Sequence, residues 1–159
     1  MKNILITGAS QGIGRATAIE AAKAGMFIGV NFKQNKVAAD ETITEIRHNG
    51  GDGIKIQCDV GDHESVKNMF KVFLNATDSL DGVFNNAGTT GPVSKIQDLN
   101  PNDLQDLVKT NVIGAYYVAQ NAAKIMVNQK KGNIVNMTSI AADIGGAGEL
   151  VHYAMTKGA

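Results

Sequence analysis

Apolar and polar positions along the chain follow two alternating patterns. Short, mostly apolar runs of strand length occur at residues 4–6, 26–32, 54–58, 82–85 and 133–139. The segments between these runs are mostly longer, and several have apolar residues at helical spacing. Helices are predicted at 12–24, 36–49, 62–76 and 101–129, and a further helix begins at His152. Because strands alternate with helices, the pattern predicts an α/β fold with a doubly wound parallel sheet and helices on both faces.

No repeat, low-complexity tract or linker divides the chain. Signals at the helix ends support the pattern: Asp62 is placed to cap one helix, Pro101 stands in the first turn of the long helix, and Gly25 ends the first helix. A chain of 159 residues is long enough to build one hydrophobic core. We therefore predict a single domain over residues 1–159.

Charge and composition exclude several classes of function. Lys and Arg total 15 and Asp and Glu total 15, so no basic excess exists to bind nucleic acid. No apolar run approaches the length of a membrane span, and the N-terminal run breaks at Gly8, too early for a signal peptide. Cys58 is the single cysteine, which excludes an internal disulfide and fits a reducing compartment. We predict a cytoplasmic protein with no nucleic-acid or membrane partner and no metal site.

Glycine is enriched and unevenly placed. The chain has 18 glycines in 159 residues, above the average share of about 7%. The segment Thr7-Gly8-Ala9-Ser10-Gln11-Gly12-Ile13-Gly14 joins the first strand to the first helix. There Gly8 would allow a tight turn, Gly12 the approach of backbone to a pyrophosphate and Gly14 close packing of helix on strand. An ordinary strand-to-helix turn is the alternative, and the position after the first strand favours phosphate binding.

Further motifs follow the glycine loop in a fixed order along the chain. They are Asp59-Val60, Asn85-Asn86-Ala87-Gly88, Asn111, Ser139 and Tyr153-Ala154-Met155-Thr156-Lys157. Together with the glycine loop, this set resembles the short-chain dehydrogenase/reductase family from end to end of the chain. The resemblance implies a Rossmann-like fold and nicotinamide-dependent oxidation of an alcohol or reduction of a carbonyl.

The resemblance also implies four catalytic residues: Asn111, Ser139, Tyr153 and Lys157. Tyr153 and Lys157 are four apart and so share one helix face. A lysine ammonium near a phenol favours the phenolate, which suits Tyr153 as general acid/base. Ser139 would hold the substrate oxygen, and Asn111 would bind a water that extends a proton relay through Lys157. His152 precedes Tyr153, but adjacent helical residues point about 100° apart, so we expect no catalytic role for it.

The same comparison predicts the cofactor contacts. Asp59 would accept a hydrogen bond from the adenine amino group and Val60 would pack on the ring. The second strand ends without a carboxylate: Phe32 stands where an NAD-selecting Asp would be, and Lys33 could pair with a 2′-phosphate. Gln11 argues against this, since many NADP-using members have a basic residue there. We favour NADP over NAD. The predicted cofactor-binding residues are Gly8, Ser10, Gln11, Gly12, Ile13, Gly14, Asn31, Phe32, Lys33, Asp59, Val60, Asn86, Ala87, Gly88, Tyr153 and Lys157.

The length of the chain is short for this family. The resemblance implies a C-terminal truncation, with the rest of the catalytic helix, two further strands, the loop over the nicotinamide and the substrate lid beyond Ala159. We therefore expect the fifth strand to be an exposed edge and Lys157 to lie in a frayed last turn. The family implies a homo-oligomer, but half of the surface that it would use is expected to be missing.

Two functions remain open at this point. The first is an NADP-dependent oxidoreductase acting on a small-molecule alcohol or carbonyl. Within it, the sequence looks most similar to glucose-1-dehydrogenase-like members, with an oxoacyl carrier-protein reductase as the nearby alternative. The second is a dinucleotide-binding remnant without turnover, or half of a split enzyme that a separate chain completes.

Overall fold

A computed structural model describes residues 1–159 and contains one parallel sheet of five strands. The strands are β1 (Asn3–Ile6), β2 (Phe27–Phe32), β3 (Asp52–Gln57), β4 (Gly82–Asn85) and β5 (Asn133–Asn136). Their order across the sheet is β3-β2-β1-β4-β5, and every neighbouring pair is parallel. The chain thus winds outward from β1 in both directions, and the order reverses between β1 and β4. This confirms the predicted doubly wound, Rossmann-like sheet.

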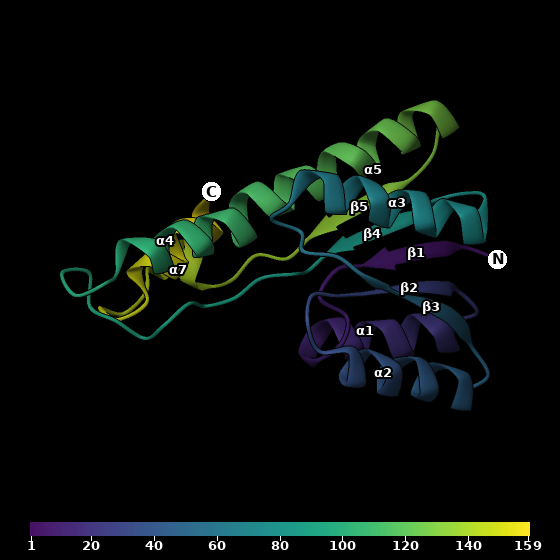
Figure 1. Ribbon diagram of the computed structural model, residues 1–159, viewed down its shortest axis with the longest axis horizontal. Helices are drawn as coiled ribbons and strands as arrows, with labels where there is room; N and C mark the ends of the chain where they lie inside the picture. The colour runs from purple at the N-terminus through teal and green to yellow at the C-terminus, as the bar shows by residue number, and fades with distance from the viewer.

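Helices cover both faces of the sheet. In Figure 1, α1 (Gly12–Lys23) and α2 (Lys36–His48) lie on one face, and α3 (His63–Thr77) and α5 (Ala115–Gln129) on the other. The remaining helices are α4 (Pro101–Val108), a π-helical segment η1 (Lys109–Gly114), α6 (Ala141–Ile144) and α7 (Val151–Gly158). The strand arrows point toward the end of the molecule where α4 and α7 lie (Figure 1). No helix has the length and apolar character that crossing a membrane would need.

Two apolar layers hold these elements together. Leu5, Met69 and Phe73 belong to a cluster of 14 buried residues on the side of α3 and α5. Ile6 and Ile28 belong to a cluster of 11 buried residues on the side of α1 and α2. Consecutive strand residues such as Leu5 and Ile6 point to opposite faces. Both faces of the sheet are therefore buried, as a parallel sheet with helices on both sides requires.

Two strands differ from the predicted bounds by two residues or more. β5 ends at Asn136 rather than at 139, because its partner β4 ends at Asn85, which pairs with Asn136. Ser139 therefore lies in the connection to α6, a short helix that the apolar pattern does not reveal. β3 covers Asp52–Gln57, in register with β2, so Cys58 follows the strand and is buried.

The long helix predicted over 101–129 is interrupted. Its middle, Lys109–Gly114, is a π-helical segment between α4 and α5. A Cβ atom on Gly114 would lie 2.9 Å from Val60 Cγ2 and 3.1 Å from the Val60 carbonyl, so the helix passes very close to the chain after β3. Such wide turns arise where an extra residue is accommodated, often at functional sites. This one contains Asn111.

The fifth strand is an edge of the sheet. β5 pairs with β4 on one side only, and Val135 within it is 58% exposed. The prediction of an exposed edge is therefore confirmed.

Candidate active site

A cleft of about 730 Å³ lies at the carboxyl ends of the strands, where ligands bind in open α/β sheets. Its wall includes every predicted cofactor-binding residue except Gly14, and it reaches from the glycine loop to Tyr153 and Lys157. Asn111 and Ser139 do not line it. A groove of about 790 Å³ between α5 and β5 contains none of the predicted site residues.

The glycine loop has the geometry predicted for its three glycines. Gly8 and Gly12 have φ of 62° and 57°, a backbone conformation that residues other than glycine adopt only at a cost in free energy. A Cβ atom on Gly14 would lie 2.4 Å from the Gly8 carbonyl oxygen, so α1 packs directly on the loop. α1 begins at Gly12, and Gln11 before it makes no side-chain cap. The first N–H groups of α1 are thus left free to bind an anion.

Asn31 holds the glycine loop to the sheet. Its side chain accepts a hydrogen bond from the Gly8 N–H (3.1 Å) and donates to the carbonyls of Ile56 (3.3 Å) and Cys58 (3.1 Å). The Asn31 carbonyl accepts from the Ala9 N–H at 2.8 Å. Asn31 is 2% exposed. Its amide is thus committed to the protein itself, although the residue borders the cleft.

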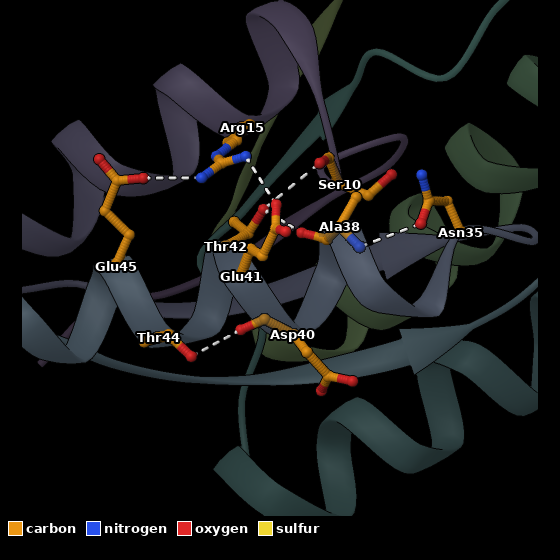
Figure 2. Close-up of polar contacts among 9 residues, drawn as sticks. All are labelled: Ser10, Arg15, Asn35, Ala38, Asp40, Glu41, Thr42, Thr44 and Glu45. Atoms are coloured by element: carbon orange, nitrogen blue, oxygen red, sulfur yellow. Dashed lines mark hydrogen bonds and ion pairs between the residues drawn. The ribbon is translucent and has the colours of Figure 1, made fainter.

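Helix α2 supports the same loop from the other side (Figure 2). Thr42 is fully buried, and its hydroxyl lies 3.4 Å from the carbonyl oxygen of Ser10 in the loop. Arg15 on α1 pairs with Glu45 at 2.9 Å and Glu41 at 3.5 Å on α2. These contacts fix α1 and α2 relative to each other where the loop meets the cleft.

The segment after β4 is bonded to the glycine loop. The Asn86 amide donates to the carbonyls of Thr7 (2.9 Å) and Gly8 (3.3 Å). The Thr7 hydroxyl accepts from the N–H groups of Asn86 and Ala87, both at 2.9 Å. A Cβ atom on Gly8 would lie 3.0 Å from Ala87 Cα. Asn86, Ala87 and Gly88 of the motif at 85–88 therefore form part of the cleft wall, hydrogen-bonded and packed to the glycine loop.

Lys33 and Asp59 are brought together at the ends of β2 and β3. Lys33 Nζ lies 2.9 Å from Asp59 Oδ2, and Asp59 Oδ1 accepts from the Gly61 N–H at 2.9 Å. Burial raises the pKa of the Asp59 carboxyl, but the hydrogen bonds from Lys33 and Gly61 and the charges of Lys33 and Lys109 outweigh it, and the pKa lies below its ordinary value. Phe32 and Val60 are buried at the same end of the cleft.

Tyr153 and Lys157 face the cleft from α7. Lys157 Nζ lies 5.9 Å from the centre of the Tyr153 ring and donates to the Met137 carbonyl at 3.0 Å. Burial lowers the pKa of the Lys157 ammonium. Lys157 is in the last turn of α7, as expected, and its bond to Met137 is a contact that the sequence does not reveal.

Asn111 and Ser139 do not line the cleft, and both make hydrogen bonds within the protein. The Asn111 amide donates to the Thr89 carbonyl (2.8 Å) and the Thr156 hydroxyl (3.0 Å) and accepts from the Thr89 N–H (2.9 Å). A Cβ atom on Gly88 would lie 3.2 Å from Asn111 Oδ1 and 3.7 Å from Lys157 Nζ, so both groups flank Gly88. The Ser139 hydroxyl accepts from the Ala141 N–H at 3.2 Å.

Several cleft residues were not predicted. Most follow directly after a predicted motif or strand, and that adjacency is the signal that could have found them. They are Gln34, Asn35, Cys58, Thr89, Thr90, Thr110 and Met137. Sequence reasoning also missed the part that His152 plays: its ring Nε2 lies 2.9 Å from the Pro92 carbonyl, which ties α7 to the connection after β4.

Comparison with curated proteins gives full-length matches to this chain. The family model described as short chain dehydrogenase matches residues 2–159. A 3-oxoacyl-(acyl-carrier-protein) reductase of Synechocystis sp. is 36% identical over 154 residues, which are 97% of this chain and 62% of that protein. An uncharacterized oxidoreductase of Escherichia coli is 36% identical over 158 residues, 98% of this chain and 64% of that protein.

Solved structures agree with these matches. NAD⁺-bound xylitol dehydrogenase has a TM-score of 0.94 and 31% identity, over 99% of this chain and 60% of that one. A short-chain type dehydrogenase/reductase from Mycobacterium marinum has a TM-score of 0.94 and 32% identity, over 99% of this chain and 64% of that one. The chain thus spans somewhat less than two thirds of the length of these relatives. From residue 2 to its last residue, it belongs to the short-chain dehydrogenase family.

Proposed function

We propose that residues 1–159 form a single dinucleotide-binding domain of an NADP-dependent oxidoreductase that interconverts an alcohol and a carbonyl. One observation carries the proposal: the glycine loop and the Tyr153–Lys157 pair border the same cleft. A phosphate-binding loop alone would serve many nucleotide-binding proteins. A tyrosine and a lysine at the other end of the cleft add a group that can move a proton.

The residues of the cleft fit a dinucleotide. Gly8 and Gly12 adopt positive φ, Gly14 lets α1 pack on the loop, and the helix begins with free N–H groups. These would hold the pyrophosphate. Asp59 and Val60 would hold the adenine, and the segment Asn86–Gly88 would border the nicotinamide half. When bound, the nicotinamide would supply or accept the hydride.

The proton chemistry falls to side chains of this chain. The Tyr153 hydroxyl would give a proton to the substrate oxygen in reduction and take one in oxidation. The Lys157 ammonium beside its ring favours the phenolate. Ser139 would hold the substrate oxygen, as the family resemblance implies. Asn111, which flanks Gly88 together with Lys157, would hold a water that extends the proton path.

The preference for NADP rests on the end of β2. The residues that end β2 include no carboxylate, and Lys33 directly after it lines the cleft with 55% of its side chain exposed. A lysine so placed can make a charge-assisted hydrogen bond to that phosphate. One solved relative, a xylitol dehydrogenase, has NAD⁺ bound, and NAD is the alternative cofactor.

Two substrate classes are supported. The Synechocystis relative and several staphylococcal relatives are 3-oxoacyl-(acyl-carrier-protein) reductases, which favours a 3-oxoacyl thioester. The xylitol dehydrogenase structure favours a sugar or polyol, in line with the resemblance to glucose-1-dehydrogenase-like members. The second candidate function is nucleotide binding without turnover by this chain alone. It is favoured by the share of the relatives that the chain spans, 62% of the Synechocystis protein.

The test is a titration of the purified chain with NADPH and NADH, followed by turnover assays. We expect nicotinamide fluorescence to report saturable binding, tighter for NADPH. Turnover is then measured with a 3-oxoacyl thioester and with an aldose. Tyr153→Phe should retain binding and lose about 100-fold or more of any turnover. Binding without turnover would favour the second candidate, and no binding of either nucleotide would contradict both.

A further inference from the structure

The charged side chains of the cleft wall are few, and two of them are bonded to each other. Lys33, Asp59 and Lys157 are the only Lys, Arg, Asp or Glu residues that line it. Lys33 follows β2 and Asp59 comes shortly after β3, whose last residues Phe32 and Gln57 are paired in the sheet. Lys33 Nζ and Asp59 Oδ2 lie 2.9 Å apart. The group available to a 2′-phosphate therefore already has an anionic partner.

The backbone orients both members of this ion pair. The Gly61 N–H donates to Asp59 Oδ1 at 2.9 Å, which leaves Oδ2 directed to Lys33. The Gln57 side chain donates to the Lys33 carbonyl at 3.0 Å, which holds Lys33 beside the end of β3. The pairing is thus a consequence of the register of β2 and β3 and of the turn at Gly61.

The carboxylate is charged at neutral pH. Although burial raises the pKa of Asp59, the hydrogen bonds from Lys33 and Gly61 and the nearby Lys109 bring it below the ordinary value. The ion pair is also partly open to solvent, with Lys33 55% and Asp59 30% exposed. Exposed ion pairs are weak and exchange partners easily. A phosphate can therefore take Lys33 from Asp59, but it meets the negative charge of Asp59 as it does so.

We propose that Asp59 is a specificity-determining residue that competes with the 2′-phosphate for Lys33 and so limits the preference for NADP over NAD. This inference rests on the proposed function, because it concerns the nucleotide bound in the same cleft. The predicted contact of Asp59 with the adenine amino group is common to both nucleotides. It cancels when the two dissociation constants are divided, whereas competition for Lys33 does not.

The experiment measures the ratio of dissociation constants for NADH and NADPH by nicotinamide fluorescence with the full chain. Asp59→Asn keeps an oxygen that can accept from adenine and from Gly61, but it removes the charge. We expect the ratio to rise by about 3- to 30-fold. Lys33→Met should lower it by a similar factor, and Asp59→Asn should have a smaller effect in the Lys33→Met background. Asp52→Asn, at the opposite end of β3, is the matched control and should leave the ratio unchanged.

The outcomes separate the inference from the function that it rests on. If Asp59→Asn changes the affinity for both nucleotides by the same factor, Asp59 affects only the fold or the contact with adenine. The inference is then wrong, while the proposed function stands. An equal effect of Asp59→Asn with and without Lys33 would likewise overturn the competition. If the unaltered chain binds neither nucleotide, the proposed function and the inference fall together.

Discussion

At the scale of single residues, much of the cleft is shaped by groups that are bonded to or packed against the protein itself. The Asn31 side-chain amide is hydrogen-bonded to Gly8, Ile56 and Cys58. Gly14 allows α1 to pack on the loop because it has no side chain. Gly14 is chosen from the glycine motif and Asn31 from its place near the end of the second strand. The sequence does not show whether such a residue holds the loop in place or contacts a ligand. The structure shows it, because it gives the burial of the side chain and the atoms that it is bonded to.

Replacing Gly14 with alanine tests this view of the loop. The new Cβ atom would meet the Gly8 carbonyl oxygen at 2.4 Å, and backbone cannot yield as a flexible side chain can. We expect a loss of about 1–3 kcal/mol in the free energy of unfolding, measured in urea, together with weaker nucleotide binding. Gly158→Ala is the control, since nothing lies within 4 Å of its Cβ position; a comparable loss there would refute the argument.

Burial of Lys157 makes the free energy of unfolding depend on pH. Burial lowers the pKa of the Lys157 ammonium in the folded chain below the ordinary 10.5 of the unfolded chain. At pH values between the folded and the unfolded pKa, the unfolded chain therefore binds more protons than the folded chain. The free energy of unfolding contributed by this group therefore rises with pH across that window. Urea titrations between neutral pH and about pH 10 should show the unaltered chain gaining stability relative to Lys157→Met. A difference that stays constant or shrinks over this range would contradict the buried ammonium.

At the scale of elements, α7 has two polar faces with separate tasks. Tyr153 and Lys157 line the cleft, whereas His152 and Thr156 are buried against the connection after β4 and the π-helical turn. His152 contacts the Pro92 carbonyl, and its Nδ1 is buried without a partner. Because a carbonyl only accepts, the ring must carry its proton on Nε2. The helix that carries Tyr153 and Lys157 is thus anchored by a neighbouring face, about 100° around its axis.

Replacing His152 with leucine removes this anchor while keeping an apolar side chain in the space. The Ser94 N–H, which donates to the Glu149 carbonyl at 3.0 Å in the same connection, should then exchange its hydrogen about fivefold faster, as expected for the loss of one hydrogen bond. His152→Gln, whose amide can donate to Pro92, should restore slow exchange. The exposed His48 on α2 supplies the control, His48→Leu. Unchanged exchange in His152→Leu would show that the contact with Pro92 does not hold the connection.

Sequence patterns predicted most of the helices and strands but not every interruption or end. Helical spacing and strand-length runs located the strands and most helices within a few residues, because burial of both sheet faces imposes those patterns. These sequence patterns missed the π-helical turn around Asn111, which lies where Gly114 closely approaches Val60. They extended β5 to Ser139, because the length of a strand is set by its partner Asn85 and not by its own composition. The resemblance, rather than periodicity, supplied Ser139 and Asn111 as site residues, and neither borders the cleft.

At the scale of the whole molecule, the open side of the sheet is the dominant feature. β5 has an unpaired edge, and beside it a groove between α5 and β5 is lined largely by apolar residues, among them Tyr116, Val127 and Ile134. Unpaired strand edges with exposed β-branched side chains are templates for pairing with another chain. β3 is the other edge strand, but the exposed Val135 on β5 and the apolar groove beside it make the β5 edge the more open of the two to another chain.

Val135→Lys tests the consequence of this asymmetry. Val135 is 58% exposed on the edge strand, and natural proteins use lysine at such edges to block pairing. We expect the unaltered chain to self-associate as its concentration rises, seen as growth of the mean mass in light scattering, and Val135→Lys to reduce it severalfold. Val37→Lys is the matched control, because Val37 is 69% exposed on α2, far along the sheet from β5. An equal effect of both substitutions would assign the association to net charge, and a monomeric unaltered chain would show that this edge is protected in solution.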